Sequence, residues 1–213
     1  QRLQQQVQAR PDAVAIVDAE RHWTYAEWDA LVAHWVDNEL AGMPPGAAFG
    51  WLGVNSAAMV ASLFACARLH LRWVPLNWRL AAPELRAMAR HAGLVRWHAD
   101  SALTALEGEA PCAAPEGNHF DDLLLVYTSG TTGEPKGAVH TQAAVVANLD
   151  AAIDAQGLNQ TSRALAVLPL FHVGGLCIQV LPTLAAGGIV KLHARFDAAT
   201  WLADVAAFRA TTS

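Results

Sequence analysis

The sequence predicts an α/β protein with mostly parallel strands, and three observations support that fold class. Short apolar runs alternate along the chain with longer segments of helical periodicity. Of the 213 residues, 54% are apolar and 15% are charged, which is a globular composition with much buried surface. Strands that alternate with helices usually pair in parallel through right-handed crossovers. The longest uncharged stretch, residues 173–190, contains Gln179, Pro182 and four glycines and is therefore a poor membrane span.

The first expected elements are a strand, a capped helix and a second strand. Residues 13–17 (AVAIV) predict the first strand. Thr24 and Glu27 have the spacing of a capping box at the start of a helix, which two prolines end. A strand at residues 47–52 follows. Asn55 is then expected to cap a helix that is apolar nearly all round and therefore buried.

The alternation continues into a less regular segment. Residues 72–76 predict a short strand, and Gly93 is the expected stop of an amphipathic helix that precedes a strand at residues 94–98. Residues 101–119 have no strong periodicity and are interpreted as a connection. We therefore expect one partial N-terminal domain over residues 1–213, with a first α/β half at 1–100, a connection at 101–122 and a second half at 123–213.

The second half repeats the alternation of strands and helices. The expected elements are a strand at residues 123–127, a helix at 142–155, a strand at 164–168, a helix at 173–186 and a strand at 189–192. Asp197 is expected to cap a final helix.

The segment TSGTTGEPKG, residues 128–137, has the composition of a phosphate-binding loop. Its glycines allow positive φ and a close backbone approach, so that consecutive N–H groups can surround an anion. Its hydroxyl groups are donors for phosphate oxygens. Lys136 adds a positive charge on a flexible stem. Only two of the fourteen Lys and Arg residues are lysines, and the choice of lysine here fits a contact with phosphate.

Other interpretations of the loop follow from generic physics. A Walker A loop ends in Gly-Lys-Ser/Thr, whereas Lys136 lies between Pro135 and Gly137. A Rossmann site needs GxGxxG after the first strand, and that spacing does not occur. A surface loop without a ligand remains open on these grounds alone, because mixtures of Gly, Thr and Pro are common in loops.

Charge and cysteine content exclude several classes of partner. The net charge is −5 and no basic run occurs, so nothing indicates nucleic acid or an anionic membrane. The three cysteines are far apart, and no CxxC or HExxH pattern indicates zinc. The first residues have no apolar core of a signal peptide. A reducing, cytoplasmic setting fits these features.

Several segments together resemble a known family. YTSGTTGEPKG closely resembles the signature loop of the ANL superfamily of adenylate-forming enzymes, which includes acyl-CoA synthetases, peptide-synthetase adenylation domains and luciferases. RPDAVAIVDAERHWTYAEWDALV resembles the family's opening strand pair and helix, and WVPLNWRL resembles a third segment. LPLFHVGGL resembles the second signature, in the form that acyl-CoA ligases carry. The resemblance extends from about Arg10 onwards and implies part of the large N-terminal domain of the acyl-CoA synthetase-like fold.

This resemblance implies a reaction and a set of site residues. A carboxylate attacks the α-phosphate of ATP, with Mg²⁺ bound, to form an acyl-adenylate, and coenzyme A then displaces AMP to give a thioester. The residues that match the loop holding the β- and γ-phosphates are Thr128, Ser129, Gly130, Thr131, Thr132, Gly133 and Lys136. A loop threonine, Thr131 or Thr132, matches the position near magnesium, and Thr131 is our choice. His172 matches the histidine of the acyl pocket, although on position alone it would be a structural turn histidine.

The same resemblance implies features that residues 1–213 do not contain. These are the magnesium-binding glutamate, the aspartate for the ribose and the C-terminal domain with its catalytic lysine. We therefore expect this stretch to be inactive alone. Fatty-acyl, aryl and succinylbenzoate acids all remain open as substrates. The alternatives to an acid–CoA ligase are a domain that loads a carrier protein and a non-catalytic remnant or binding fragment.

Overall fold

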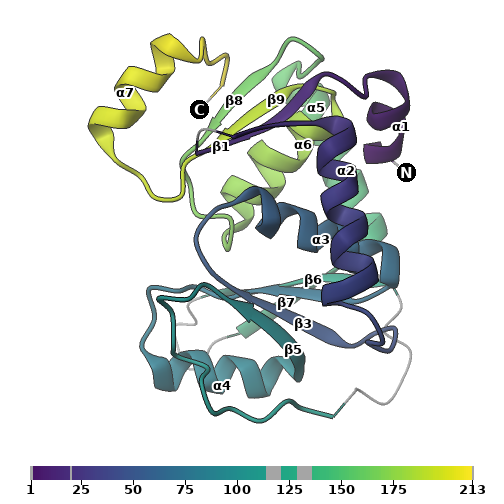
Figure 1. The fold of residues 1–213 in the computed structure, drawn as a ribbon, viewed down its shortest axis with the longest axis vertical. Coiled ribbons are helices and arrows are strands. Elements are labelled where there is room, and N and C mark those ends of the chain that lie inside the picture. The colour runs from purple at the N-terminus through teal and green to yellow at the C-terminus, as the bar shows by residue number, and fades with distance from the viewer. Residues whose placement is uncertain (1, 20, 114–120, 129–135, 213) are drawn as a thin grey trace. The chain divides into compact units, whose positions relative to one another are not determined.

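The computed structural model describes residues 2–19, 21–113, 121–128 and 136–212, and these form two compact units. Unit 1 consists of Gln1–His34, Asn55–Ala61 and Val145–Ser213, and unit 2 consists of Trp35–Val54 and Ser62–Ala144. Each unit contains its own sheet (Figure 1). The described residues of the expected connection at 101–122 lie within unit 2.

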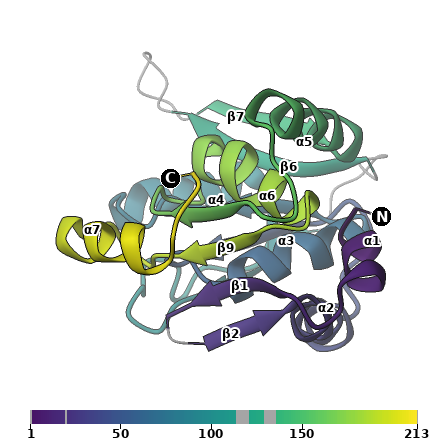
Figure 2. The same cartoon turned by 90° about the horizontal axis from the view of Figure 1, so that it is seen from above.

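In the described part of the chain, the sheet of unit 1 has four strands in the order β2-β1-β9-β8. Figure 2 shows β2, β1 and β9 side by side. They are β2 (Arg21–Thr24), β1 (Val14–Asp18), β9 (Ile189–Leu192) and β8 (Arg163–Ala166). β9 pairs in parallel with both β1 and β8, and β2 runs antiparallel to β1. The antiparallel pair agrees with the strand pair that the family's opening segment implies.

The described residues of unit 2 form a five-stranded sheet in the order β5-β3-β4-β6-β7. The strands are β5 (Leu94–Ala99), β3 (Ala48–Leu52), β4 (Arg72–Pro75), β6 (Asp122–Thr128) and β7 (Lys136–Thr141). The first four pair in parallel, and β7 is antiparallel to β6. Both sheets are therefore mostly parallel, which confirms the predicted fold class.

The helices alternate with these strands. They are α1 (Arg2–Ala9), α2 (Tyr25–His34), the π-helix η1 (Trp35–Glu39), α3 (Ala57–Leu69), α4 (Ala82–Ala92), α5 (Gln142–Gln156), the π-helix η2 (Gly174–Val180), α6 (Leu181–Ala185) and α7 (Ala198–Ala207). Pro182 is the second residue of α6, which continues directly from η2. None of these described helices is both long and apolar enough to cross a bilayer.

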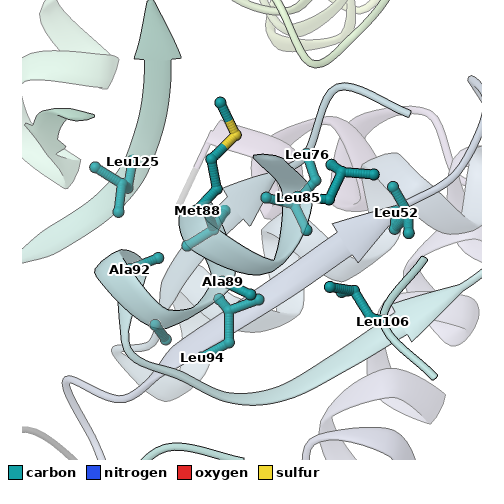
Figure 3. Close-up of a cluster of buried hydrophobic side chains, with 11 residues drawn as sticks. Leu52, Leu76, Leu85, Met88, Ala89, Ala92, Leu94, Leu106 and Leu125 are labelled. Atoms are coloured by element: carbon teal, nitrogen blue, oxygen red, sulfur yellow. The ribbon is translucent and has the colours of Figure 1, made fainter. Parts of the chain in front are cut away.

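Helix α4 anchors the core of unit 2. Leu85, Met88, Ala89 and Ala92 have the i, i+3, i+4, i+7 spacing of one helical face, and all four are buried. They form one cluster with leucines of β3, β5 and β6 (Figure 3). Burial of this face fixes α4 against the sheet that carries β6 and the loop after it.

Three predicted helix signals are confirmed. The Thr24 N–H donates to Glu27 Oε2 at 2.8 Å, and the Glu27 N–H donates to Thr24 Oγ1 at 3.1 Å, which completes the capping box. Gly93 ends α4 with a φ of 66°, a conformation that glycine adopts without steric cost. Asp197 caps α7 by accepting from the Thr200 N–H at 2.8 Å.

The structure corrects the sequence analysis at three places. Asn55 does not cap α3; Ser56 and Asp18 do, because they accept from N–H groups of its first turn. A strand, β7, lies where the sequence analysis expected the loop to run directly into a helix. Helix α1 also had no counterpart in the prediction, because its glutamine-rich sequence has little apolar periodicity.

Candidate nucleotide and acyl site

The predicted phosphate loop connects the two antiparallel strands β6 and β7. Thr128 ends β6 and Lys136 begins β7, and the two residues are paired across the hairpin. The Thr128 hydroxyl donates to the Lys136 carbonyl oxygen at 3.5 Å, and both residues are exposed. The structure therefore brings together the first and last predicted phosphate-binding residues. The others, which are Ser129, Gly130, Thr131, Thr132 and Gly133, lie outside the described residues.

Close packing of the hairpin explains the glycine at its base. A Cβ on Gly137 would lie 2.7 Å from Leu125 Cδ1 and 3.5 Å from Tyr127 Cε1. Leu125 is buried in the core of unit 2 and has little room to move away. The absence of a side chain on Gly137 thus lets β7 approach β6 closely just beside Lys136.

Tyr127, one residue before Thr128, is a residue whose role the sequence analysis missed. Its hydroxyl lies 2.7 Å from His91 Nδ1 and 3.3 Å from the Met88 carbonyl oxygen, both on α4. Burial raises the pKa of Tyr127 to about 12, against a smaller opposing effect of the Arg72 charge. The hydroxyl is therefore neutral at physiological pH and is a hydrogen-bond donor. Its place as the first residue of the YTSGTTG motif is the sequence feature that could have identified it.

His172 lies in unit 1, on the turn between β8 and η2, whereas Thr128 and Lys136 lie in unit 2. Its backbone N–H donates to the Pro169 carbonyl oxygen at 3.1 Å, and its side chain is exposed. Its ring contacts the ring of Phe171, with centroids 4.7 Å apart, and Phe171 itself is buried. The turn therefore fixes an imidazole at the surface against an aromatic ring that belongs to the core.

A buried amide holds this turn in place. The Asn55 side chain, 4% exposed, donates to the Leu168 and His193 carbonyl oxygens at 3.0 Å each. It also accepts from the Leu170 N–H at 2.9 Å. These bonds tie the first part of the turn to the segment after β9, and a buried polar network of this kind fixes one conformation. Asn55 thus supports the His172 turn rather than the start of α3.

Lys191 is the other lysine of the chain, and it has a structural partner. Its ammonium group donates to Asp204 Oδ1 at 2.5 Å, and His193 Nε2 lies 2.9 Å from Asp204 Oδ2. The hydrogen bond from Lys191 lowers the pKa of Asp204 more than any other contact, and His193 adds to the effect. The three side chains join β9 and the segment after it to α7. Lys191 is therefore engaged in holding α7.

Metal ligands of the usual types do not gather among the described residues. No three His, Cys, Asp or Glu side chains within that part of the chain form a group that could hold a metal ion. Thr131, the residue that the sequence analysis placed near magnesium, lies outside it.

Comparisons with known proteins show the family to which this mostly parallel α/β chain belongs. The AMP-binding enzyme family matches residues 3–106 and 95–213. The chain belongs to this family. The resemblance to adenylate-forming enzymes is thereby confirmed.

Two relatives and one solved structure illustrate the similarity. The indoleacetate–CoA ligase of Aromatoleum aromaticum is 37% identical over 88% of this chain and 43% of its own length. The feruloyl-CoA synthase of an Amycolatopsis species is 36% identical over 94% of this chain and 45% of its own length. The o-succinylbenzoate CoA synthetase of Bacillus subtilis, in complex with its acyl-adenylate intermediate, superposes with a TM-score of 0.88 and 26% identity, covering 99% of this chain and 60% of that chain. The chain thus spans about half the length of the curated relatives it matches.

Proposed function

We propose that the protein carrying this chain is an acid–CoA ligase, which activates a carboxylic acid with ATP as an acyl-adenylate and transfers the acyl group to coenzyme A. The observation that carries the proposal is the β6–β7 hairpin, which pairs Thr128 with Lys136 at the base of a Gly/Thr-rich loop. Membership of the AMP-binding enzyme family supports it. The named activities of the two relatives, both CoA-thioester-forming enzymes, support the second step.

In this proposal the hairpin loop binds the β- and γ-phosphates of ATP. The exposed Lys136 ammonium group neutralises phosphate charge, and the Thr128 hydroxyl is a donor beside it. Backbone N–H groups and hydroxyls of residues 129–133 complete the anion site. Mg²⁺ accompanies ATP as its counter-ion, and Thr131 is the residue we assign beside it. Fixing the triphosphate in this way aligns the α-phosphate for attack by a weak nucleophile.

His172 is proposed to contact the carboxylate of the acid. An exposed imidazole fixed against the buried Phe171 ring gives a polar group at the edge of an apolar surface. Binding pockets for small organic acids commonly combine these two features. Asn55 holds the backbone of the turn that carries this imidazole.

An aromatic carboxylic acid is the substrate class we propose. The relatives that share 37% and 36% identity with this chain are named for indoleacetate and ferulate, both of which are aromatic acids. A flat aromatic acid would also suit the neighbourhood of the Phe171 ring, since aromatic pairs gain from offset or edge contacts.

The test is carboxylate-dependent exchange between ATP and pyrophosphate, followed by coenzyme A-dependent release of AMP. It uses the full gene product that carries residues 1–213, with indoleacetic, ferulic, 2-succinylbenzoic and long-chain fatty acids as candidate substrates. We expect exchange with the aromatic acids and thioester formation on addition of coenzyme A. Exchange without any coenzyme A-dependent step would contradict the ligase proposal and favour an enzyme that loads a carrier protein.

The two lysines supply a matched pair of variants. Lys136→Ala should lower kcat/KM for ATP by about tenfold or more, because a charge-assisted contact with phosphate contributes roughly 1.5–3 kcal/mol. Lys191→Ala should leave this parameter nearly unchanged, because Lys191 is paired with Asp204. Equal activity of wild type and Lys136→Ala would remove the proposed role of the loop lysine. Absence of exchange with every acid, together with absence of ATP binding, would refute the proposed function.

A further inference from the structure

The contacts of Tyr127 link the phosphate loop to helix α4. Tyr127 is the next-to-last residue of β6, and its hydroxyl reaches His91 and Met88, which lie in the last two turns of α4. The rings of Tyr127 and His91 also meet edge to face, with centroids 5.7 Å apart and planes at 71°. His91 and Met88 precede Tyr127 by 36 and 39 residues in the sequence, and all three residues belong to unit 2.

Hydrogen-bond counting shows how this group of contacts is satisfied. The Tyr127 hydroxyl has one proton but two neighbours within hydrogen-bonding distance. Both contacts are satisfied when His91 Nδ1–H donates to the Tyr127 oxygen and the Tyr127 hydroxyl donates to the Met88 carbonyl. The half-buried hydroxyl is therefore held by α4 through two bonds.

Tyr127 also neighbours β7, the second strand of the hairpin. Gly137, which pairs with Tyr127 across the two strands, has no side chain, and its Cβ position lies 3.5 Å from the Tyr127 ring. The backbone just beside Lys136 therefore packs on the Tyr127 ring. Thr128 follows Tyr127 directly. Tyr127 is thus the chain neighbour of Thr128 and the strand partner of Gly137, the residue after Lys136.

Packing in the core of unit 2 holds α4, the helix that bonds to Tyr127, in place. Met88, which supplies the carbonyl acceptor, also places its side chain in the buried cluster of unit 2 (Figure 3). Leu85 lies in the same cluster, one turn earlier. A close-packed core resists displacement, so it holds α4 in place. A group that is hydrogen-bonded to α4 is therefore also held in a fixed position.

We propose that Tyr127 and His91 are positioning residues for ATP, because they fix the strand ends that present Thr128 and Lys136 to its β- and γ-phosphates. This inference rests on the proposed function. Small displacements of phosphate-binding groups lower affinity and rate even where the protein stays folded. The link therefore acts on nucleotides that carry β- and γ-phosphates and not on AMP.

The test compares the affinities of the full gene product for Mg-ATP and for AMP, measured by isothermal titration calorimetry. Tyr127→Phe removes the hydroxyl that makes both bonds to α4, and it should weaken Mg-ATP binding by about three- to tenfold and leave AMP binding unchanged. His91→Leu should have a similar effect, and His91→Asn should restore much of the affinity because its amide can replace Nδ1. The double variant Tyr127→Phe/His91→Leu should be no weaker than either single variant, since both remove the same link.

The chain contains a matched control for loss of a tyrosine hydroxyl. Its other tyrosine, Tyr25, is buried in unit 1 and lies within 3.0 Å of the Leu184 and Gly188 carbonyl oxygens. Tyr25→Phe should lower thermal stability without changing the ratio of Mg-ATP to AMP affinity. A change in that ratio for Tyr25→Phe as large as for Tyr127→Phe would mean that general destabilisation is responsible, and would overturn the inference.

The outcomes separate this inference from the proposed function. Failure of the wild-type protein to bind Mg-ATP would refute both. Normal Mg-ATP binding by the wild type, with Tyr127→Phe and His91→Leu unchanged, would refute the positioning role alone. Equal losses for Mg-ATP and AMP would also refute it. If Tyr127→Phe does not fold, His91→Leu decides the matter, because His91 is exposed and its replacement leaves the core intact.

Discussion

Two adjacent glycines in the second signature segment should respond in opposite ways to substitution by alanine. Gly174 and Gly175 both lie at the start of η2, directly after the turn that carries His172. A Cβ on Gly174 would have one neighbour, Leu168 Cδ1, at an ordinary contact distance of 3.8 Å. A Cβ on Gly175 would lie 2.9 Å from the Leu168 carbonyl oxygen and 3.1 Å from the Pro169 carbonyl oxygen. These are backbone atoms, which cannot rotate away as a side-chain end can.

The expected magnitudes follow from these distances. Replacing a helical glycine by alanine gains about 0.5–1 kcal/mol, chiefly by restricting the unfolded chain. Gly174→Ala should show this gain. Gly175→Ala has the same gain but adds overpacking, which costs about 1–3 kcal/mol. The Leu168 carbonyl cannot simply withdraw, because it also accepts from the buried Asn55 amide. The two variants should therefore differ in free energy of unfolding by about 1–3 kcal/mol.

Urea unfolding of both variants and the wild type, in one buffer, measures this difference. Gly174→Ala should be at least as stable as wild type, and Gly175→Ala less stable. Equal stability of the two variants, or a larger loss for Gly174→Ala, would show that the close approach of η2 to the Leu168–Pro169 backbone is not what selects glycine at this position.

Two further predictions concern polar groups of unit 1. Asn55→Ala should lower the free energy of unfolding by about 2–4 kcal/mol, because three backbone groups, two of them in buried bonds, lose their partner, whereas the exposed Asn159→Ala should cost far less in the same urea titration. Asp204→Asn should destabilise by roughly 1 kcal/mol near neutral pH. The folded pKa of Asp204 is depressed by Lys191, so its carboxylate adds stability above the unfolded pKa, near 4, and that stability disappears as pH falls through the lower folded value. A gap between variant and wild type that stays constant from pH 7 to pH 3 would contradict this assignment.

Most of the fold could be predicted because its signals are local. The Thr24–Glu27 capping box, the Gly93 stop and the Asp197 cap each depend on residues within a few positions of one another. The apolar face of α4 is likewise visible as spacing within one segment. Such features survive in the structure because tertiary packing does not oppose them. The mostly parallel pairing of the strands then follows from the alternation of elements.

The failures have a common physical cause, which is that the deciding partner lies far away in sequence. Asn55 has a residue type and position suited to a helix cap, but its amide bonds to the backbone at Leu168, 113 residues later. β7 has few apolar residues and, within the described part of the chain, pairs with β6 alone, so its sequence carries little strand periodicity. Secondary-structure propensity describes a segment in isolation, whereas the structures of Asn55 and β7 depend on their contacts with other segments.

The chemistry of the candidate site depends on residues that are close in sequence, whereas its geometry depends on residues that are far away in sequence. The loop residues 128–137 carry the donors and the charge for phosphate, and these are legible from the sequence alone. Their placement depends on residues outside the motif: His91 and Met88 hold the strand before the loop, just as Asn55 holds the turn of His172. A signature transplanted without such supports would keep its donors and lose their positions. Residues that contact a motif from distant segments are therefore the ones whose substitution should alter nucleotide affinity without removing any group that touches the nucleotide.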